Sequence, residues 1–155
     1  MNTARRATAA DAAEVTRLRL LMFCELGKQD DTWADASTAS LAQELSSGAP
    51  RLTASVVDDP FGKGLIACGV GYLERRLPGP GGASMFGHVG SMYTEVAHRR
   101  QGHGRAVLRS LLDWLWEHDA ERAQLWASEL GAPLYAAEGF SLGSPLWQVR
   151  SPHRE

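Results

Sequence analysis

The sequence predicts a mixed α/β fold, of the α+β kind, in which a mostly antiparallel sheet is flanked by about four helices. Segments with strand and helix periodicity follow one another in the order strand–helix–helix–strand–strand–strand–helix–strand–helix–strand, which indicates a layered fold. The length of 155 residues suits one domain with a core of useful size. The sequence contains no repeat and no long linker, so residues 1–155 are expected to form a single domain.

Five elements are predicted in the first half of the chain. They are an edge strand at 3–8, helices at 11–27 and 35–45, and paired strands at 52–57 and 65–73. The first helix has cap residues at Thr8 and Asp11, and Gly27 fits its end. The polar, acidic segment 27–35 is expected to be a loop.

Five further elements are predicted in the second half. They are strands at 88–96 and 122–127, helices at 102–118 and 130–138, and terminal strand material at 140–150. The helix at 102–118 has the clearest pattern, because Val107 and several leucines form one broad apolar face. The segment 78–82 is rich in Gly and Pro and is expected to be a loop or turn rather than a helix.

The composition excludes several classes of function. With 16 Lys and Arg against 18 Asp and Glu, the net charge provides no global attraction for nucleic acid or an anionic membrane. No apolar run approaches the roughly 20 residues of a membrane span, and the N-terminal segment lacks the apolar stretch of a signal peptide. Cys24 and Cys68 are too few for a disulfide framework or zinc site and are expected to be small buried hydrophobes. A cytoplasmic protein is expected.

A Gly-rich, cationic turn stands directly before the most strongly patterned helix. Residues 99–105 read Arg-Arg-Gln-Gly-His-Gly-Arg. The first N–H groups of a helix have no partner within the helix, and its N-terminus attracts anions. Gly102 and Gly104 remove Cβ atoms where a ligand must approach these N–H groups closely. The segment predicts a phosphate or pyrophosphate site; the simpler alternative is a strand-to-helix turn with incidental surface arginines.

One anionic ligand to consider is a dinucleotide, because Gly102, Gly104 and Val107 have nearly the spacing of the dinucleotide fingerprint. That fingerprint belongs to a βαβ unit with an acidic residue at the end of the next strand. Here the next strand runs into Trp-Ala-Ser at 126–128, and no carboxylate stands where the ribose would need it. Several antiparallel-looking strands also precede the motif, so the dinucleotide interpretation is disfavoured.

The stretch MYTEVAHRRQGHGRAVLRSLL resembles the acyl-CoA-binding motif of the GCN5-related N-acetyltransferase (GNAT) superfamily. Members carry Arg/Gln-x-x-Gly-x-Gly/Ala between a strand and a long helix, and residues 99–104 fit this pattern. The segment Leu-Tyr-Ala-Ala-Glu-Gly-Phe at 134–140 resembles a second family motif at the expected distance. A Pro that relatives often have in the short link is Val96 here. The N-terminal segment also resembles the family's first strand and helix.

The resemblance implies a sheet that is splayed after its fourth strand by a bulge, and acetyl-CoA as the acyl donor. Backbone N–H groups of the Gly-rich loop would cradle the pyrophosphate, and the pantetheine arm would lie along the central strand like an extra strand. Ser128 takes the place of an Asn that contacts the cofactor arm in some relatives. The cofactor-binding residues implied in this way are Met92, Tyr93, Thr94, Arg99, Arg100, Gln101, Gly102, His103, Gly104, Arg105 and Ser128.

Acetyl transfer to an amine requires a proton acceptor for the amine, donors for the developing oxyanion and a proton for the departing thiolate. The resemblance makes Tyr135 the catalytic candidate for protonating the thiolate, because a phenol titrates near pH 10. A Tyr that only packs its ring in the core is the simpler alternative. The general base stays open among Glu25, Glu95 and a water chain, since the position of the base in some relatives falls near Ala123.

The acceptor is expected to bind at the loop 25–33 between the first two helices. The carboxylates of this loop and Trp33 suit a cationic amine, by charge and by cation–π attraction. Polyamines, aminoglycosides, amino acids and protein amines all stay open. His98 and His103 lack a third ligand, so no metal is expected. Family habit implies a homodimer.

Two functions from different classes follow. The main hypothesis is an acetyl-CoA-dependent N-acetyltransferase that acts by direct transfer to a primary amine in a ternary complex. The alternative is a non-catalytic acyl-CoA-binding or regulatory module on the same fold, because the position of the base is vacant. Both predict binding of CoA, and only the enzyme releases thiol in the presence of an acceptor.

Overall fold

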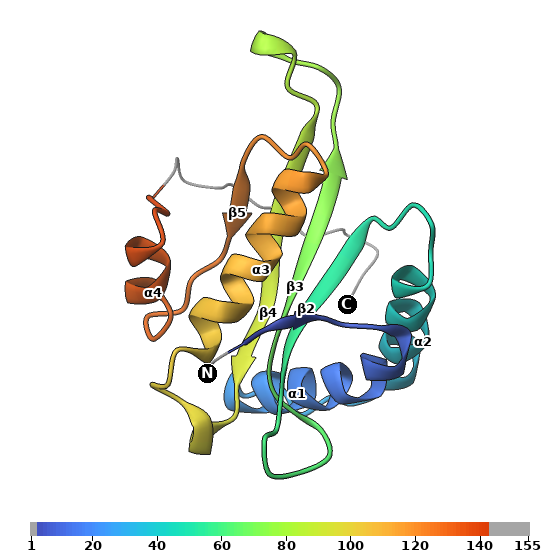
Figure 1. The fold of residues 1–155 in the computed structure, drawn as a ribbon, viewed down its shortest axis with the longest axis vertical. Helices are drawn as coiled ribbons and strands as arrows, with labels where there is room; N and C mark the ends of the chain where they lie inside the picture. The colour runs from blue at the N-terminus through green and yellow to red at the C-terminus, as the bar shows by residue number, and fades with distance from the viewer. Residues whose placement is uncertain (1–2, 143–155) are drawn as a thin grey trace.

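The computed structural model describes residues 3–142 and shows a mixed sheet with helices on both faces (Figure 1). The strands are β1 (Arg5–Arg6), β2 (Leu52–Asp58), β3 (Leu65–Arg75), β4 (Met85–Thr94) and β5 (Ala123–Leu125). The helices are α1 (Ala12–Glu25), α2 (Ala34–Leu45), α3 (His103–Glu117) and α4 (Ala132–Ala137). The predicted order of elements is confirmed up to α4, and most of the terminal strand predicted at 140–150 lies outside the described residues.

The five described strands follow one another across the sheet in the order of the sequence. Strands β1 to β4 are antiparallel neighbours, and β5 is parallel to β4. The helix α3 provides the crossover between the two parallel strands, as such a connection requires. The prediction of a mostly antiparallel sheet is therefore confirmed, and the connection through α3 brings the Gly-rich turn to the end of β4.

Each face of the sheet has its own apolar core. Helices α1 and α2 pack on one face through Val15, Leu18 and Leu41. On the other face α3 packs its predicted apolar side, with Val107, Leu108, Leu111 and Leu115 fully buried. Trp114 is buried beside them. The second core continues to α4 through Leu134 and Tyr135, which fixes the short helix against the start of α3.

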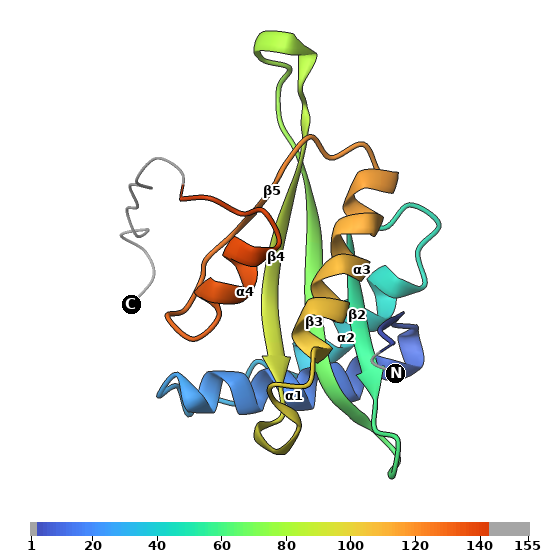
Figure 2. The same cartoon turned by 60° about the vertical axis from the view of Figure 1, so that its left-hand side comes forward.

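Several boundaries differ from the predicted ones; β5, for example, is confined to Ala123–Leu125 within the predicted 122–127. The hairpin of β3 and β4 is longer than expected, because pairing continues to Arg75 opposite Met85 and projects beyond the helices in both ribbon views (Figure 2). The strand β4 ends at Thr94 rather than at 96, where a 3-10 turn begins. Residues Pro80–Gly82 form a single 3-10 turn, and Gly81 within it has a left-handed φ of 79°, so the segment is a turn, as expected.

A bulge interrupts the pairing of β3 and β4. Cys68 faces Tyr93, whereas Val70 faces Gly90, so two residues of β4 stand opposite Gly69 alone. These two residues are Ser91 and Met92. Ser91 has a φ of 52°, an uncommon conformation for a residue with a side chain. The bulge bends β4 and increases its local twist, and such features are frequent beside functional sites.

The N-terminal strand is attached by Arg5, whose guanidinium binds Asp11 at 2.8 Å and Asp58 at 2.7 Å. Hydrogen bonding to Arg5 lowers the pKa of both carboxyl groups below the ordinary 3.8. Groups with a lowered pKa in the folded state stabilise it above their unfolded pKa, and this contribution is lost as the pH falls through the folded pKa. The stability provided by Arg5 is therefore expected to be present at neutral pH and to disappear below pH 3.8.

Replacement of Arg5 by Gln is expected to lower the thermal midpoint at pH 7 and to have a vanishing effect as the pH is reduced below 3.8. The check is a series of thermal unfolding curves for both proteins across this pH range. The pairs are partly exposed, so the difference at pH 7 is expected to be small, of about 1 kcal/mol. A difference that is equally large at acid and neutral pH would contradict the assignment to the two carboxylates.

Candidate active site

The strand β4 has an open edge next to the bulge. Within residues 3–142, β4 pairs with β3 along its length, whereas its pairing with β5 is confined to Gly87, His88 and Val89. The stretch from Gly90 to Thr94 therefore has no strand neighbour on the β5 side of the described sheet. An extended ligand can pair with a free strand edge through backbone hydrogen bonds. The carbonyl of Thr94 already accepts a hydrogen bond from Arg99 Nε at 2.9 Å.

The start of α3 lies directly after this edge in the chain. Arg100 and Gly102 both have a left-handed backbone, at φ 65° and 84°. The first described hydrogen bond of the helix joins the N–H of Ala106 to the carbonyl of Gly102 at 3.1 Å. The preceding N–H groups of His103 to Arg105 are those for which a helix has no internal acceptor. The turn therefore presents backbone donors at the positive end of a helix dipole, which is the arrangement that binds anions.

Helix α4 closes on the start of α3 and carries Tyr135. A Cβ atom on Gly104 would lie 3.3 Å from Leu134 Cδ2, so the glycine permits the close approach of the two helices. Glu138, at the end of α4, binds Arg105 at 2.9 Å and Arg109 at 3.0 Å. The pKa of Glu138 is lowered, mainly by its hydrogen bond with Arg109. Packing and charge thus hold α4 beside the Gly-rich turn.

The Tyr135 ring is half-buried and packs edge-on against Phe140, with ring centroids 5.9 Å apart. Gly131 leaves room for this ring, because a Cβ atom there would lie 3.0 Å from Tyr135 Cε2 and 3.4 Å from Ser128 Oγ. Burial raises the pKa of Tyr135, so the phenol is protonated at neutral pH. Ser128 lies next to it, and its hydroxyl accepts a hydrogen bond from the Gly131 N–H at 3.2 Å.

The Arg99 guanidinium forms an ion pair with Glu25 and is not a free cation in the turn. Its Nη2 contacts both carboxylate oxygens of Glu25, at 2.8 and 2.9 Å, and its guanidinium lies over the Tyr93 ring. The Tyr93 hydroxyl donates to Glu25 at 3.0 Å. The hydrogen bond from Arg99, followed by that from Tyr93, lowers the pKa of Glu25. This group joins the end of α1 to the end of β4, and it leaves Glu25 a weak base.

The other groups considered as a base or nucleophile are Glu95 and the two cysteines. Glu95 is bound by Arg17 at 2.7 Å. Cys68 is buried as expected, and burial raises the pKa of its thiol to about 12, which makes it a poor nucleophile. Cys24 is exposed, so the expectation that both cysteines are buried was wrong for Cys24. It lies at the last turn of α1, where it contacts the Gln29 side chain.

His103 is the first residue of α3, and its ring is buried with Nδ1 lacking a hydrogen-bond partner in the described structure. Burial, and then the neighbouring His98, lowers the pKa of His103. Within residues 3–142 no group of His, Cys, Asp and Glu side chains is arranged to hold a metal ion. In the same range, no helix has the length and apolar character needed to cross a membrane.

A pocket of about 550 Å³ lies between α1 and α2, where the acceptor was expected. Its lining is less acidic than the sequence of the joining loop indicates. Arg19 and Lys28 line it together with Asp30, whereas Glu25 is turned toward Arg99. The Trp33 ring already has a cation beside it, since the Arg19 guanidinium lies 5.0 Å from the ring centroid. Arg19 could not be predicted as a pocket residue, because a single Arg in an amphipathic helix has no local signal in the sequence.

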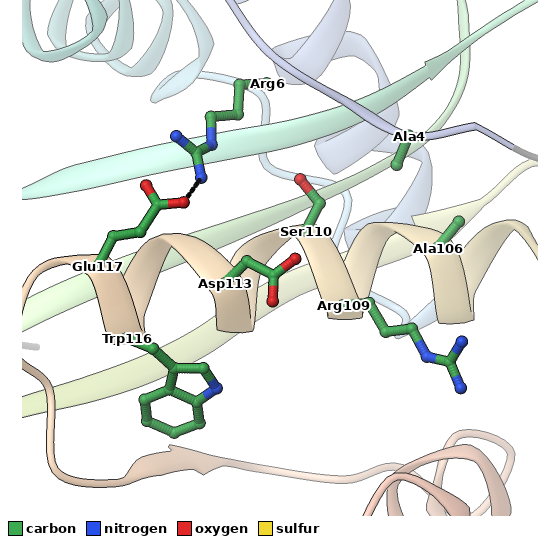
Figure 3. Close-up of a pocket in the computed structure, with 8 residues that line it drawn as sticks. All are labelled: Ala4, Arg6, Ala106, Arg109, Ser110, Asp113, Trp116 and Glu117. Atoms are coloured by element: carbon green, nitrogen blue, oxygen red, sulfur yellow. Dashed lines mark hydrogen bonds and ion pairs between the residues drawn. The ribbon is translucent and has the colours of Figure 1, made fainter.

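A second hollow, of about 700 Å³, lies along the outer side of α3 next to β1 (Figure 3). Figure 3 shows Arg6 reaching Glu117 at 2.8 Å, while Arg109 and Trp116 point to the opposite side of the helix. This surface contains none of the predicted site residues. Trp116 is 45% exposed and Trp126 65%, so neither belongs to the core.

Several solved structures with this fold are described as acetyltransferases. A predicted acetyltransferase with acetyl-CoA from Clostridium acetobutylicum has a TM-score of 0.83 and 20% identity, over 97% of this chain and 96% of that chain. A GCN5-related N-acetyltransferase from Ralstonia eutropha JMP134 has a TM-score of 0.78 and 24% identity, over 95% and 97%. AAC(6')-Iy in complex with the bisubstrate analogue CoA-S-monomethyl-acetylneamine has a TM-score of 0.76 and 12% identity, over 96% of each chain. No curated protein sequence matches the chain.

The fold is therefore that of the acetyltransferases. Residues 16–140 match the sequence model of the Acetyltransferase (GNAT) family, and the chain belongs to this family. The chain is therefore an enzyme of the acyltransferase class. The resemblance found in the Gly-rich turn and in the segment 134–140 is confirmed at the level of family and fold, while the role of each site residue stays a prediction.

Proposed function

We propose that the chain is an acetyl-CoA-dependent N-acetyltransferase that transfers the acetyl group directly to a primary amine. The observation that carries the proposal is the turn before α3, where left-handed residues at Arg100 and Gly102 present free helix N–H groups beside the open edge of β4. These features fit a long ligand with a phosphate part and an amide-containing arm. Acetyl-CoA supplies such an arm together with an activated acyl group.

The backbone of the chain performs the binding steps in this proposal. The N–H groups from Arg100 to Arg105 hold the pyrophosphate, and the edge of β4 at 92–94 pairs with the pantetheine arm. A backbone N–H at the bulge donates to the thioester oxygen as negative charge develops on it. Gly102 permits this arrangement, because its φ of 84° costs a residue with a Cβ atom about 1–2 kcal/mol.

Two proton transfers complete the reaction. The amine nitrogen attacks the acyl carbon, the carbon–sulfur bond breaks, and Tyr135 donates its phenolic proton to the departing sulfur. The raised pKa of Tyr135 supports a donor that is protonated at neutral pH. Glu25 and Glu95 are both bound to arginines. We therefore assign uptake of the amine proton to water that exchanges with bulk solvent.

Thermal unfolding with saturating acetyl-CoA tests the first step. A ligand at about a hundredfold its dissociation constant stabilises the protein by roughly 2.7 kcal/mol. At this size the midpoint is expected to rise by roughly 5–10 °C. NADH is the control and is expected to leave the midpoint unchanged. If saturating acetyl-CoA produced no shift, the proposal would be abandoned.

A non-catalytic acyl-CoA-binding module is the second candidate, because both carboxylates near the site are engaged in ion pairs. It predicts the same shift with acetyl-CoA. The measurement that separates the two candidates is the release of free thiol from acetyl-CoA in the presence of amines. Release that depends on the amine supports the enzyme, and binding without release for every amine class supports the module.

A further inference from the structure

The pocket between α1 and α2 is lined by two positively charged side chains and one carboxylate. Arg19 comes from the middle of α1 and Lys28 from the loop after it, and both line the pocket with the aromatic rings of Phe23 and Trp33. One carboxylate, that of Asp30, also lines it. Its Oδ1 accepts two hydrogen bonds within the loop, from the Thr32 N–H at 2.9 Å and the Thr32 hydroxyl at 2.6 Å.

Arg19 is held in place by neutral groups. Its Nε donates to Ser91 Oγ at 2.9 Å and its Nη1 to Ser37 Oγ at 2.5 Å. Its planar head lies 5.0 Å from the Trp33 ring centroid and 5.6 Å from that of Phe23. Among the ion pairs of residues 3–142, none includes Arg19 or Lys28, although Arg5, Arg17 and Arg99 all bind carboxylates. Arg19 is thus a half-buried, fixed guanidinium without an anion in the described structure.

A partly buried cation that lacks an anion is costly unless a ligand supplies one. The guanidinium fork binds carboxylate and phosphate groups in particular, because its parallel N–H groups match two oxygens. Nη2 of Arg19 makes no hydrogen bond in the described structure, since the two bonds of its head come from Nε and Nη1. Lys28, on the exposed rim of the pocket, adds a second positive charge.

The position of Arg19 connects this pocket to the proposed transfer site. Its partner Ser91 is one of the two bulge residues of β4, next to the open edge. A small molecule whose anionic group contacts Arg19 therefore has its other end within reach of the bulge. We propose that the acceptor is a small primary amine that also carries an oxyanion, either a carboxylate or a phosphate, which Arg19 and Lys28 bind in this pocket. The proposal rests on the proposed function, and it replaces the expectation of a purely cationic acceptor.

The test is a binding experiment that does not need acetyl-CoA. The indole N–H of Trp33, which donates to the Asp30 carbonyl at 2.7 Å, provides an NMR signal at the pocket that a Trp33→Phe variant assigns. Two pairs of amines are titrated, and the members of each pair differ in the oxyanion: phenylalanine against phenethylamine, and glucosamine 6-phosphate against glucosamine. Spermidine represents a purely cationic amine. The two pairs distinguish a carboxylate from a phosphate.

In at least one pair, the amine that carries the oxyanion is expected to bind about 10-fold or more tightly than the amine that lacks it. Arg19→Gln is expected to weaken the binding of this oxyanion-bearing amine by about 10- to 100-fold. The binding of the amine that lacks the oxyanion is expected to stay unchanged. Lys28→Gln is expected to weaken the binding of the oxyanion-bearing amine less. Because Lys28 is exposed, this variant keeps the test valid even if Arg19→Gln unfolds. The matched controls are Arg75→Gln and Lys63→Gln, two exposed cations outside the pocket. Equal or tighter binding of phenethylamine, glucosamine and spermidine would overturn the inference.

The measurements distinguish a wrong acceptor class from a wrong assignment as an acetyltransferase. If acetyl-CoA binds and thiol is released with amines that lack an oxyanion in preference to those that carry one, the enzyme stands and the acceptor class is wrong. If oxyanion-bearing amines bind at Arg19 and acetyl-CoA does not bind, the pocket assignment stands and the acetyltransferase proposal fails. The two titrations therefore give independent results on the same protein.

Discussion

Replacing Tyr135 by Phe is expected to lower kcat for acetyl transfer by about 10²–10⁴-fold, the range for loss of a general acid. The affinity for acetyl-CoA is expected to stay the same, because its phosphate part is assigned to backbone groups of the α3 turn. The substitution removes one hydroxyl, and within residues 3–142 this hydroxyl has no hydrogen-bond partner. The packing of the ring against Phe140 is retained.

The thermal midpoint of Tyr135→Phe is therefore expected to match that of the wild type. A matched control is Tyr72→Phe, because Tyr72 is a partly buried tyrosine of β3 that packs beside His88, away from α4. Steady-state kinetics of thiol release and a titration with acetyl-CoA provide the measurements. An unchanged kcat in Tyr135→Phe would show that Tyr135 only packs in the core and that another group protonates the thiolate.

Replacing Gly69 by Ala is expected to destabilise the fold by about 1–3 kcal/mol, the usual cost of inserting a methyl group into a packed core. A Cβ atom at Gly69 would lie 2.5 Å from Met92 Sδ, 2.8 Å from Val107 Cγ1 and 2.9 Å from Leu111 Cδ1. Three side chains from β4 and α3 would have to move, and two of them belong to the core beneath α3. The thermal midpoint is expected to fall by about 2–4 °C for each kcal/mol.

The same change is expected to weaken acetyl-CoA binding, because Met92 is part of the bulge at the open edge of β4. Gly48→Ala is the matched control, since a Cβ atom there has no neighbour within 4 Å and the residue is exposed. Thermal unfolding of both variants with and without acetyl-CoA separates loss of stability from loss of binding. A Gly69→Ala protein with the midpoint of the wild type would mean that the bulge and α3 pack less tightly than described.

The sequence predicts those parts of the fold that have a local cause. The apolar side of α3 has a strong helical period, and the predicted helix 102–118 agrees with His103–Glu117 within one residue at each end. Gly27 ends α1 in a left-handed conformation, as expected of a helix stop. The extra length of the β3–β4 hairpin has no such local cause. Its outer pairs, such as Arg75 with Met85, form because the two strands meet, and neither segment alone has a clear alternating pattern.

The candidate site is predictable to the extent that it consists of backbone. The Gly-rich turn and the segment of Tyr135 are recognisable from their residues, and the fold brings them together. The side-chain pairs of the site could not be predicted, because they join residues that are distant in the sequence. Arg99 binds Glu25 across 74 positions, and the sequence gives no sign that these two candidate site residues pair with each other. Arg19 and Ser91 are 72 positions apart.

The pocket between α1 and α2 shows that the composition of one loop does not determine the charge of a pocket. The acidic residues of the loop 25–33 predict a site that attracts cations. In the folded chain Glu25 faces Arg99, Asp30 is bonded to Thr32, and Arg19 enters the pocket from a neighbouring helix turn. The charge of a pocket is set by the groups that line it, and here two helices contribute to the lining together with the loop.

The acetyl-CoA site that we propose uses backbone N–H groups of the α3 turn, and every residue type except Pro provides such a donor. Substituting Gln101 removes a side chain and leaves the main-chain donor in place, whereas Arg100 has a left-handed φ of 65° and Arg105 binds Glu138. Only Gly102, with its φ of 84°, is tied to one residue type by backbone conformation. The same cradle can then survive in sequences that have little else in common. The structural relatives at 12% to 24% identity and TM-scores of 0.76 to 0.83 show that the fold itself persists while most residues change.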